Sequence, residues 1–330
     1  MNIIFLSFIN IVIVFYLIIN SKKIANFFLI NDKPKKTSVH KKTVPLTGGI
    51  ILIFPVLSFF YFEYLANNLY LREFVGLVFI SNIFFLIGFF DDRNNLFAIT
   101  RIFLLLFSVI IFFLITHPTF FFEEIYLISL DKKINLGFLF LILMSLIIIL
   151  LQNALNLVDG INCLLKLFSI FVFISLILLS NKYILDNYLL LIILPLVIMI
   201  IFNSKNYFFL GSSGNSLVTI LCLYICLNYN VEFDGNFPFE NYIIIFLIPT
   251  IDMLRLFIIR LYTHGKILLK DKNHFHHNLY KKFGTFNANF FYLSICFFPV
   301  LIIKFFSINY FLCIILTIFL FFFCNYLVKK

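Results

Sequence analysis

The sequence predicts an all-α integral membrane protein, a polytopic bundle of about 10–11 transmembrane helices. The chain has 330 residues, of which 63% are hydrophobic and only 12% are charged, and its mean hydropathy is +1.08. Soluble domains are about one quarter charged, so a water-soluble fold could not cover this much apolar surface. The apolar residues also form separate runs of about 20, the length that crosses a bilayer as a helix.

The expected helices follow one another along the whole chain, which predicts a single membrane domain over 1–330. Eleven apolar runs qualify, namely 2–20, 48–65, 74–90, 97–116, 137–153, 161–180, 187–203, 214–229, 241–259, 288–306 and 309–327. The longest outer connector, 117–136, has room for a short hairpin. The shortest connectors lie near 91–96 and 306–309.

The basic residues predict the orientation of these helices. Seven lysines lie in 21–47, six basic residues lie in 260–287, and the chain ends with Lys329-Lys330. Cytoplasmic loops carry an excess of Lys and Arg, so these three segments are expected on the cytoplasmic side of a bacterial inner membrane. The basic residues lie between apolar runs, so the net charge of +10 indicates anionic lipid or substrate and no nucleic acid.

Polar residues collect at the junctions that this orientation makes cytoplasmic. Charged and amide side chains at membrane helices mark functional sites. The charge bias and the positions of these residues are independent observations that agree. They predict cytoplasmic active-site loops near 21–47, 91–96, 153–160, 204–215 and 260–287.

Two of these junctions carry carboxylates. Asp91-Asp92 could bind a hard divalent cation or activate a nucleophile, or simply end a helix at the headgroup level. Asn153, Asn156 and Asp159 are spaced three apart, so on a helix they share one face and could reach one ion or one diphosphate. Helix capping and interhelical hydrogen bonding are the alternative interpretation of this second group.

Two further junctions carry small residues and histidines. The turn 211–214, with the sequence Gly-Ser-Ser-Gly, could cradle phosphate at a helix N-terminus or could be an ordinary loop with an N-cap. His274, His276 and His277 could bind zinc, bind phosphate or shuttle protons. The alternative for the histidines is a solvated basic loop.

Taken in this order, the motifs resemble the polyprenyl-phosphate N-acetylhexosamine-1-phosphate transferases. This glycosyltransferase 4 superfamily includes phospho-N-acetylmuramoyl-pentapeptide transferase. The resemblance runs from about Lys41 to Lys282 and includes the segment 44–49, with the sequence Val-Pro-Leu-Thr-Gly-Gly. The H-x-H-H pattern and Pro45-Leu46 are closer to the GlcNAc-1-phosphate branch than to the pentapeptide branch.

The resemblance implies a role for each matching residue. The implied catalytic residues are Asp91, Asp92, Asp159 and His276. The implied ligands of a Mg²⁺ or Mn²⁺ cofactor are Asp91, Asp92 and Asn156. The implied substrate-binding residues are Lys41 or Lys42, Arg101, Asn153, Asn162, Phe209, His274 and His277. Of these, Asn162 and Phe209 would bind the uracil ring.

The implied reaction transfers an N-acetylhexosamine 1-phosphate, with GlcNAc as the first choice, from a UDP-sugar to polyprenyl phosphate. The implied partners are the lipid, the UDP-N-acetyl sugar and the membrane, with a second copy of the chain as a further candidate. Two positions depart from the family, because Ser212 stands where a metal-binding Asp is usual and Asn215 replaces a usual small residue. The alternatives are an impaired relative that acts as a scaffold, which Ser212 motivates, and a lipid-linked sugar transporter.

Overall fold

The protein is almost entirely helical in the computed structural model, which confirms the all-α class. The structure describes residues 3–34, 42–66, 68–180, 189–264, 273–306 and 308–329. Its helices are α1 (Ile3–Ile19), α2 (Ser21–Phe28), α3 (Gly48–Leu65), α4 (Leu71–Asn94), α5 (Ala98–Thr116), α6 (Leu139–Val158), α7 (Leu164–Ser180), the π-helix η1 (Leu189–Ile193), α9 (Leu194–Ser204), α10 (Gly211–Glu232), α11 (Phe239–His264), α12 (Phe275–Phe306) and α13 (Tyr310–Lys329). Its strands are β1 (Asn31–Asp32), β2 (Val44–Pro45), β3 (Glu124–Leu127) and β4 (Lys132–Asn135).

Each of the eleven predicted apolar runs appears as a helix, although not all of them have spanning length. Among the described residues, eight helices are long and apolar enough to cross a membrane. The number rises to nine if α1 and α2, which meet at a bend of 67°, count as one span. Helices α7 and α9 are apolar but have only 17 and 11 residues. The chain is therefore a multi-pass membrane protein.

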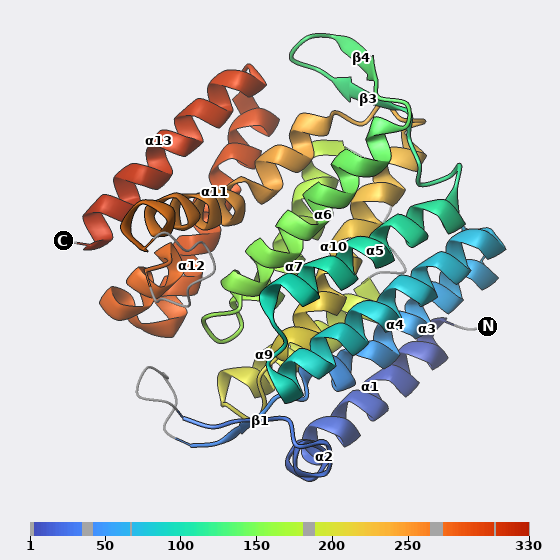
Figure 1. The fold of residues 1–330 in the computed structure, drawn as a ribbon, viewed down its shortest axis with the longest axis vertical. Helices are drawn as coiled ribbons and strands as arrows, with labels where there is room; N and C mark the ends of the chain where they lie inside the picture. The colour runs from blue at the N-terminus through green and yellow to red at the C-terminus, as the bar shows by residue number, and fades with distance from the viewer. Residues whose placement is uncertain are drawn as a thin grey trace. The chain divides into compact units, whose positions relative to one another are not determined.

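The connector 117–136 contains the predicted hairpin. Strands β3 and β4 pair antiparallel from Glu124 opposite Asn135 to Leu127 opposite Lys132 (Figure 1). The carboxylate of Glu240 in α11 accepts hydrogen bonds from the N–H and the hydroxyl of Ser129, at 3.0 and 2.7 Å. A side chain from a distant helix therefore fixes the turn of the hairpin.

The chain divides into two compact units, and the predicted motifs are distributed between them. Unit 1 comprises Met1–Phe121 and Ile184–Tyr224, and unit 2 comprises Phe122–Tyr183 and Ile225–Lys330. In unit 1, α4 packs on α5 and on α3 (Figure 1). In unit 2, α6 packs on α11, α7 packs on α12 and α11, and α13 packs on α12 and α11. The prediction of one functional domain over 1–330 stays a prediction.

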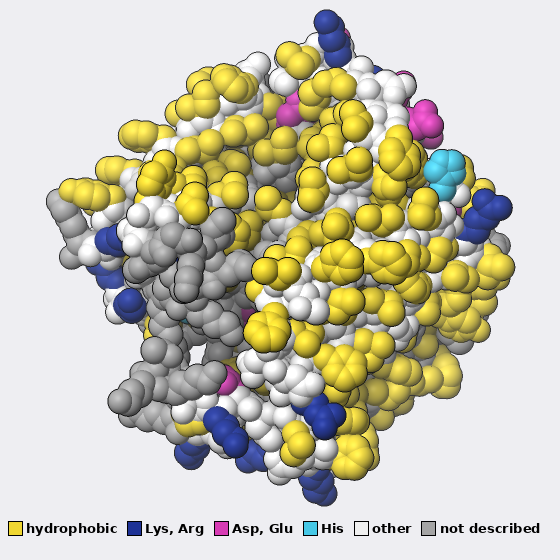
Figure 2. All heavy atoms as spheres, viewed as in Figure 1, with side chains coloured by type: hydrophobic (Ala, Val, Ile, Leu, Met, Phe, Trp, Pro, Cys, Tyr) yellow, Lys and Arg dark blue, Asp and Glu magenta, His cyan; other side chains and the backbone are white. Residues whose placement is uncertain are grey.

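Unit 1 presents the surface that a lipid-facing bundle requires. Figure 2 shows hydrophobic side chains over α4 and α5, and Lys and Arg side chains at the end where α2 and β1 lie. On α5, Phe103, Phe107 and Leu114 are each more than half exposed. Large exposed apolar patches mark contact with a membrane or a partner.

A glycine interrupts α12 between its first turns and its long apolar part. Gly284 has φ 76° and ψ 178°, so the helical path breaks there. The segment before the break, 275–283, contains two of the predicted histidines, His276 and His277. These two residues therefore begin a helix and are not part of an extended loop as predicted.

Candidate active site

The aspartate pair of unit 1 caps the start of α10. Asp91 and Asp92 occupy the last turn of α4. The two carboxylate oxygens of Asp92 accept hydrogen bonds from the N–H groups of Ser212 and Ser213, at 2.7 and 3.1 Å. The hydroxyl of Ser213 donates a third hydrogen bond to Asp92, at 2.8 Å. A helix N-terminus has unpaired N–H groups and a positive dipole end. The Asp92 carboxylate accepts hydrogen bonds from those N–H groups and places a negative charge at that end.

The Gly/Ser turn is thus a capped helix N-terminus, one of the two interpretations that the sequence allowed. Helix α10 begins at Gly211, three residues earlier than the predicted boundary. Gly211 has φ 73°, and a Cβ there would lie 2.7 Å from a carboxylate oxygen of Asp92. Glycine is required at this position because it adopts that φ without a side chain. The first N–H groups of α10 bind Asp92, so a phosphate would have to displace the carboxylate to use them.

Asp91 joins the same cluster from the neighbouring position. One of its carboxylate oxygens accepts a hydrogen bond from the Ser212 hydroxyl, at 2.8 Å, and from Nη1 of Arg101, at 3.0 Å. The Arg101 and Asp91 side chains keep 21% and 14% of their exposure. The predicted basic residue and the predicted acid therefore form an ion pair that solvent can still reach.

Close backbone contacts hold this cluster together. A Cβ on Gly88 of α4 would lie 2.5 Å from Cα of Ser213, and a Cβ on Gly48 would lie 2.5 Å from Cα of Leu210. The N–H of Phe209 donates to the carbonyl of Pro45, at 2.8 Å, and the Phe209 carbonyl accepts from the N–H of Gly48, at 3.1 Å. The motifs predicted at 44–49 and at 209–214 are therefore in direct contact. Lys42 is exposed, and Lys41 lies outside the described residues.

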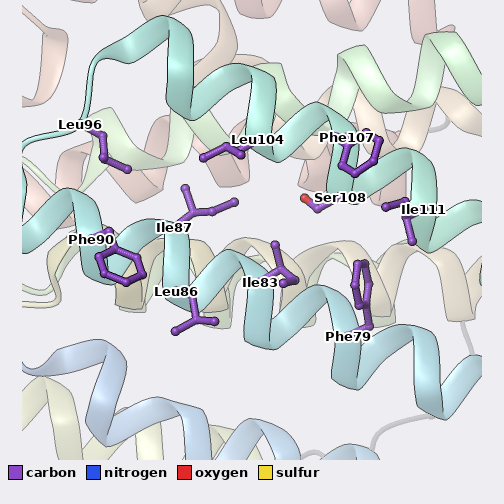
Figure 3. Close-up of a pocket in the computed structure, with 10 residues that line it drawn as sticks. All are labelled: Phe79, Ile83, Leu86, Ile87, Phe90, Leu96, Leu104, Phe107, Ser108 and Ile111. Atoms are coloured by element: carbon purple, nitrogen blue, oxygen red, sulfur yellow. The ribbon is translucent and has the colours of Figure 1, made fainter.

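An apolar groove between α4 and α5 lies beside the aspartate pair (Figure 3). It has a volume of about 470 Å³ and is lined almost entirely by apolar side chains. Phe90, which directly precedes Asp91, and Leu96 line one end of the groove, and Phe79 and Ile111 line the other. A groove of this kind suits a hydrocarbon chain whose polar end lies near Asp91.

In unit 2, the Asp159-Gly160 turn contacts the histidine segment. Asp159 follows the last residue of α6 as its C-cap. A Cβ on Gly160 would lie 2.6 Å from Nε2 of His276 and 2.8 Å from Nε2 of His277. Glycine therefore lets both imidazoles approach the turn. The sequence elements N-x-x-N-x-x-D-G and H-x-H-H, about 115 residues apart, meet in one unit.

The two predicted asparagines of α6 and the one that follows it lie near the same end of unit 2. Asn153 donates to the carbonyl of Ile149 at 2.9 Å, one turn back on α6, and Asn156 is half-buried on the same helix. The carbonyl of Asn162 accepts a hydrogen bond from Asn289 of α12, at 2.9 Å. That contact joins the segment between α6 and α7 to the helix that carries the histidines.

The two buried histidines have different surroundings. His276 is only 1% exposed, and within the described residues neither of its ring nitrogens has a hydrogen-bond partner. His274 is 3% exposed, and its Nδ1 lies 3.1 Å from Asp252 while its Nε2 lies 3.4 Å from Arg260. The H-x-H-H pattern gives no sign of this difference.

The sequence analysis missed Asp252 and Arg255, which form a buried ion pair in α11 with an N···O distance of 2.7 Å. Their signal was present, because an acid and a base three residues apart interrupt an otherwise apolar run. Charged residues inside a membrane span are functional candidates by default. Both residues lie inside a predicted span, away from the junctions that carry the other polar residues.

Lys166 is a third residue that the sequence did not single out. Its side chain is fully buried in the first turn of α7, and within the described residues its Nζ has no hydrogen-bond partner. It interacts electrostatically with Asp159 and Cys163. Burial raises the pKa of the Cys163 thiol, which favours the less reactive thiol form over the thiolate.

The predicted site residues therefore fall into two groups. Lys42, Asp91, Asp92, Arg101 and Phe209 lie in unit 1. The predicted residues of unit 2 are Asn153, Asn156, Asp159, Asn162, His274, His276 and His277. Convergence of the two groups on one cleft stays a prediction.

The residues of unit 1 fit a divalent cation that arrives with phosphate. Among the described residues, no group of three or more His, Cys, Asp or Glu could hold a metal ion. Mg²⁺, however, is usually held by one or two carboxylates together with phosphate oxygens and water. Asp91 and Asp92 are adjacent carboxylates bonded to the same helix start, and the Asp91 side chain is reachable from solvent. The donor set suits Mg²⁺ bound jointly with a substrate.

Comparison with known proteins identifies the family of this central part of the chain. Residues 74–230 match the model of Glycosyl transferase family 4. They form a glycosyl transferase family 4 segment. The family resemblance predicted from the sequence is thereby confirmed, and the matched residues include Asp91, Asp92, Asp159 and Ser212.

One curated relative supports the same family. The chain is 30% identical over 142 residues to the phospho-N-acetylmuramoyl-pentapeptide transferase of Acetivibrio thermocellus. The match covers 40% of this chain, and the chain spans 42% of the length of that relative. Asp252 and the histidine segment lie beyond the family match, so the structure provides the evidence for their place in the fold.

Proposed function

We propose that this chain transfers an N-acetylhexosamine 1-phosphate, with GlcNAc 1-phosphate as the first candidate, from a UDP-sugar to a polyprenyl phosphate such as undecaprenyl phosphate. This would be the initiating membrane step of cell-wall or cell-surface polysaccharide synthesis, including lipopolysaccharide. One observation carries the proposal. The Asp91-Asp92 pair is bonded to the start of α10 inside the segment that matches glycosyl transferase family 4.

The reaction is a phosphoryl transfer that needs no covalent intermediate with the protein. A phosphate oxygen of the lipid attacks the phosphorus that carries the sugar. The bond from that phosphorus to the UMP oxygen breaks, UMP leaves, and a polyprenyl-diphosphate sugar remains. Because the attacking phosphate is already anionic, the protein mainly has to position two anions and screen their repulsion.

In this proposal, unit 1 supplies positioned charge. Arg101 is fixed by its ion pair with Asp91, at 3.0 Å, and would face the diphosphate. Exposed Lys42 would meet a phosphate at the membrane surface, and Phe209 would stack on uracil. Mg²⁺ or Mn²⁺ held by Asp91 and Asp92, with Asn156 as a further oxygen ligand, would supply charge neutralisation of the diphosphate.

Unit 2 would supply the groups that contact the donor. His276 is buried, and among the described residues neither ring nitrogen has a hydrogen-bond partner; an unpaired buried polar group costs about 1–3 kcal/mol. A phosphate oxygen or a sugar hydroxyl would provide the missing partner. Asp159, one residue before the glycine that contacts His276, would act beside it, with Asn153, Asn162 and His277 as further donor contacts.

The groove between α4 and α5 supports a lipid acceptor. Its walls are apolar, and one end lies at Phe90, next to Asp91 (Figure 3). A polyprenyl chain in this groove would bring its phosphate to the aspartate pair from the membrane side. The donor UDP-sugar, by contrast, is water-soluble and would arrive from the cytoplasm.

A scaffold without activity is the second candidate, and Ser212 motivates it. A serine hydroxyl is a neutral oxygen donor and binds Mg²⁺ less strongly than a carboxylate does. The scaffold predicts that the cluster of unit 1 is retained for stability alone. In that case the Asp92 cap of α10 and the ion pair between Asp91 and Arg101 would stabilise the fold without contributing to catalysis.

An exchange assay separates the two candidates. Membranes containing the protein would be incubated with radiolabelled UMP, a UDP-sugar and polyprenyl phosphate, and label in the UDP-sugar would be measured. We expect label transfer that requires the lipid phosphate, tested over a panel of UDP-N-acetyl sugars. Absence of transfer with every sugar, from a protein that is inserted and folded, would support the scaffold.

A further inference from the structure

A buried network in unit 2 surrounds the first turn of α12. Asp252 in α11 is 3% exposed. Its carboxylate accepts hydrogen bonds from the N–H of Phe275, at 3.0 Å, and from Nη2 of Arg255, at 2.7 Å. Arg255 also donates to the carbonyl of Asn273, at 2.9 Å. The network thus fixes the residues on both sides of His274.

The hydrogen-bond partners of His274 assign a donor or acceptor role to each of its ring nitrogens. A carboxylate only accepts hydrogen bonds, so Nδ1 of His274 donates to Asp252 across 3.1 Å. A guanidinium only donates, so Nε2 accepts from Arg260 across 3.4 Å. This hydrogen-bond geometry points to the tautomer with the proton on Nδ1. Both ring nitrogens are bound within the protein.

His276 is the opposite case. Its ring lies 5.4 Å from that of His274, with 13° between the planes, so the two imidazoles are stacked. Both of its nitrogens lack partners in the part of the chain that the structure describes, although the side chain is buried. Gly160 leaves room for the ring on the side of the Asp159 turn.

We propose that Asp252 and His274 are positioning residues that hold the start of α12, so that His276 meets the substrate. Asp252 caps the helix and fixes the tautomer of His274, and the stacked ring of His274 supports His276. This inference rests on the proposed function, and it transfers His274 from the substrate-binding set to the supporting network. The three histidines then have different roles within one short motif.

Two variants of His274 distinguish support from substrate contact. The side-chain amide of His274→Asn lies where Nδ1 lies and can still donate to Asp252. The amide of His274→Gln extends to the place of Nε2 instead. We expect kcat to fall by about tenfold or less in the Asn variant and on the order of 100-fold in the Gln variant, because misplacement of a reacting group is costly. KM for the UDP-sugar should change little in either variant.

Activity in the Gln variant above that of the Asn variant, or a loss confined to KM for the UDP-sugar, would overturn the assignment. Asp252→Asn is the matched change at the acceptor of the hydrogen bond between His274 and Asp252. It keeps the size of the side chain, but an amide has only one accepting oxygen, so it cannot accept from both His274 and Arg255, which bind different oxygens of Asp252. We expect it to lower kcat on the order of 100-fold.

A spectroscopic measurement tests the network without any transfer assay. The chain has six histidines, so ¹⁵N-histidine labelling in a lipid bilayer gives few signals, and the His274 signal is the one lost in His274→Asn. We expect a protonated Nδ1 and an unprotonated Nε2 at neutral pH, and loss of this tautomer in Asp252→Asn. A proton on Nε2 in the unaltered protein would overturn the inference. Failure of the exchange assay alone would count against the proposed function and leave this result standing.

Discussion

At the scale of single residues, Asp92 has two assigned roles, a structural role as the cap of α10 and a chemical role in catalysis. Its carboxylate accepts two backbone N–H groups and one hydroxyl at the start of α10. Sequence analysis assigns it to catalysis through the family resemblance. The two assignments predict different consequences of a single substitution, because a cap contributes to stability and a reacting group contributes to rate.

We expect Asp92→Asn to lower the transfer rate by on the order of 100-fold or more, the size of a lost acid–base or charge contribution. An amide nitrogen cannot accept a hydrogen bond, so the cap of α10 should weaken by about 1 kcal/mol as well. The measurements are the exchange rate and the thermal unfolding of the protein in detergent. Asp131→Asn, on the turn between β3 and β4, is the matched control. A normal exchange rate in Asp92→Asn would remove Asp92 from the chemistry.

Ser212 allows a test of the metal prediction. Its hydroxyl donates to Asp91 at 2.8 Å, so Ser212→Asp would place a third carboxylate beside Asp91 and Asp92. We expect the Mg²⁺ concentration needed for half-maximal transfer to fall, because an added carboxylate is a charged hard ligand. A Mg²⁺ titration of both proteins side by side measures this. An unchanged or higher requirement would mean that the site is built around a neutral residue and that the carboxylates only repel one another.

Residue roles were predictable only where they depend on residue type and order. The carboxylates, asparagines and histidines at the expected junctions appear in one unit or the other as local clusters. The distinction between His274 and His276 could not be predicted, since it depends on Asp252 and Arg260 from another helix. Asp252 itself was missed because it lies inside a predicted membrane span, away from the junctions where the other polar residues collect.

At the scale of helices, glycines determine how closely α4 approaches α10. A Cβ on Gly88 would lie 2.5 Å from the backbone of Ser213, whereas a Cβ on Gly76 of the same helix would meet the side-chain methyl of Thr116. We expect Gly88→Ala to destabilise the protein by about 1–3 kcal/mol, the usual range for overpacking, and to impair transfer. An unfolding temperature of Gly88→Ala equal to that of the unaltered protein would show that the contact is not tight.

The apolar groove between α4 and α5 is the proposed binding site of the polyprenyl chain, and this placement can be tested. The chain has no tryptophan, so one introduced tryptophan is a specific fluorescent reporter. Leu104 lines the groove, and Leu114 lies on the same helix but is not among the groove residues. We expect added polyprenyl phosphate to shift the emission of Leu104→Trp and not that of Leu114→Trp. KM for the lipid should rise on the order of tenfold in Leu104→Trp, as expected for a filled apolar site. Equal responses of the two variants would point to general lipid contact.

Helix positions were predictable from hydropathy, whereas helix ends were not. All eleven apolar runs became helices because lipid and core both favour the same side chains. The start of α10 lies three residues before its predicted position. The first turns of α12 begin at Phe275, before the break at Gly284, where the sequence predicted a loop, and the long apolar part follows that break, close to the predicted first residue 288. In both cases the cap is a carboxylate from another helix, Asp92 or Asp252, which no local pattern reveals.

At the scale of the whole molecule, the class and the order of helices follow from composition alone. The segments 35–41 and 265–272, which carry part of the predicted positive charge, lie outside the described residues, and Asp271 is among them. The cytoplasmic position of both clusters of polar residues therefore stays a prediction. It places the Asp92 group of unit 1 and the His276 group of unit 2 on one side of the membrane and on one substrate.

A double-mutant cycle tests that shared substrate. Residues that act as one catalytic unit show losses far from multiplicative, whereas independent sites multiply. We expect Asp92→Glu and His276→Asn, chosen because each should leave a residual rate, to give a double variant little slower than the worse single variant. Asp92→Glu combined with Asp131→Asn serves as the independent pair and should multiply. If the losses of Asp92→Glu and His276→Asn multiply in the same way, the two clusters do not act on a common reacting centre. When two groups stabilise the same transition state together, displacing one of them already removes most of that joint stabilisation. The second substitution therefore lowers the rate only slightly further.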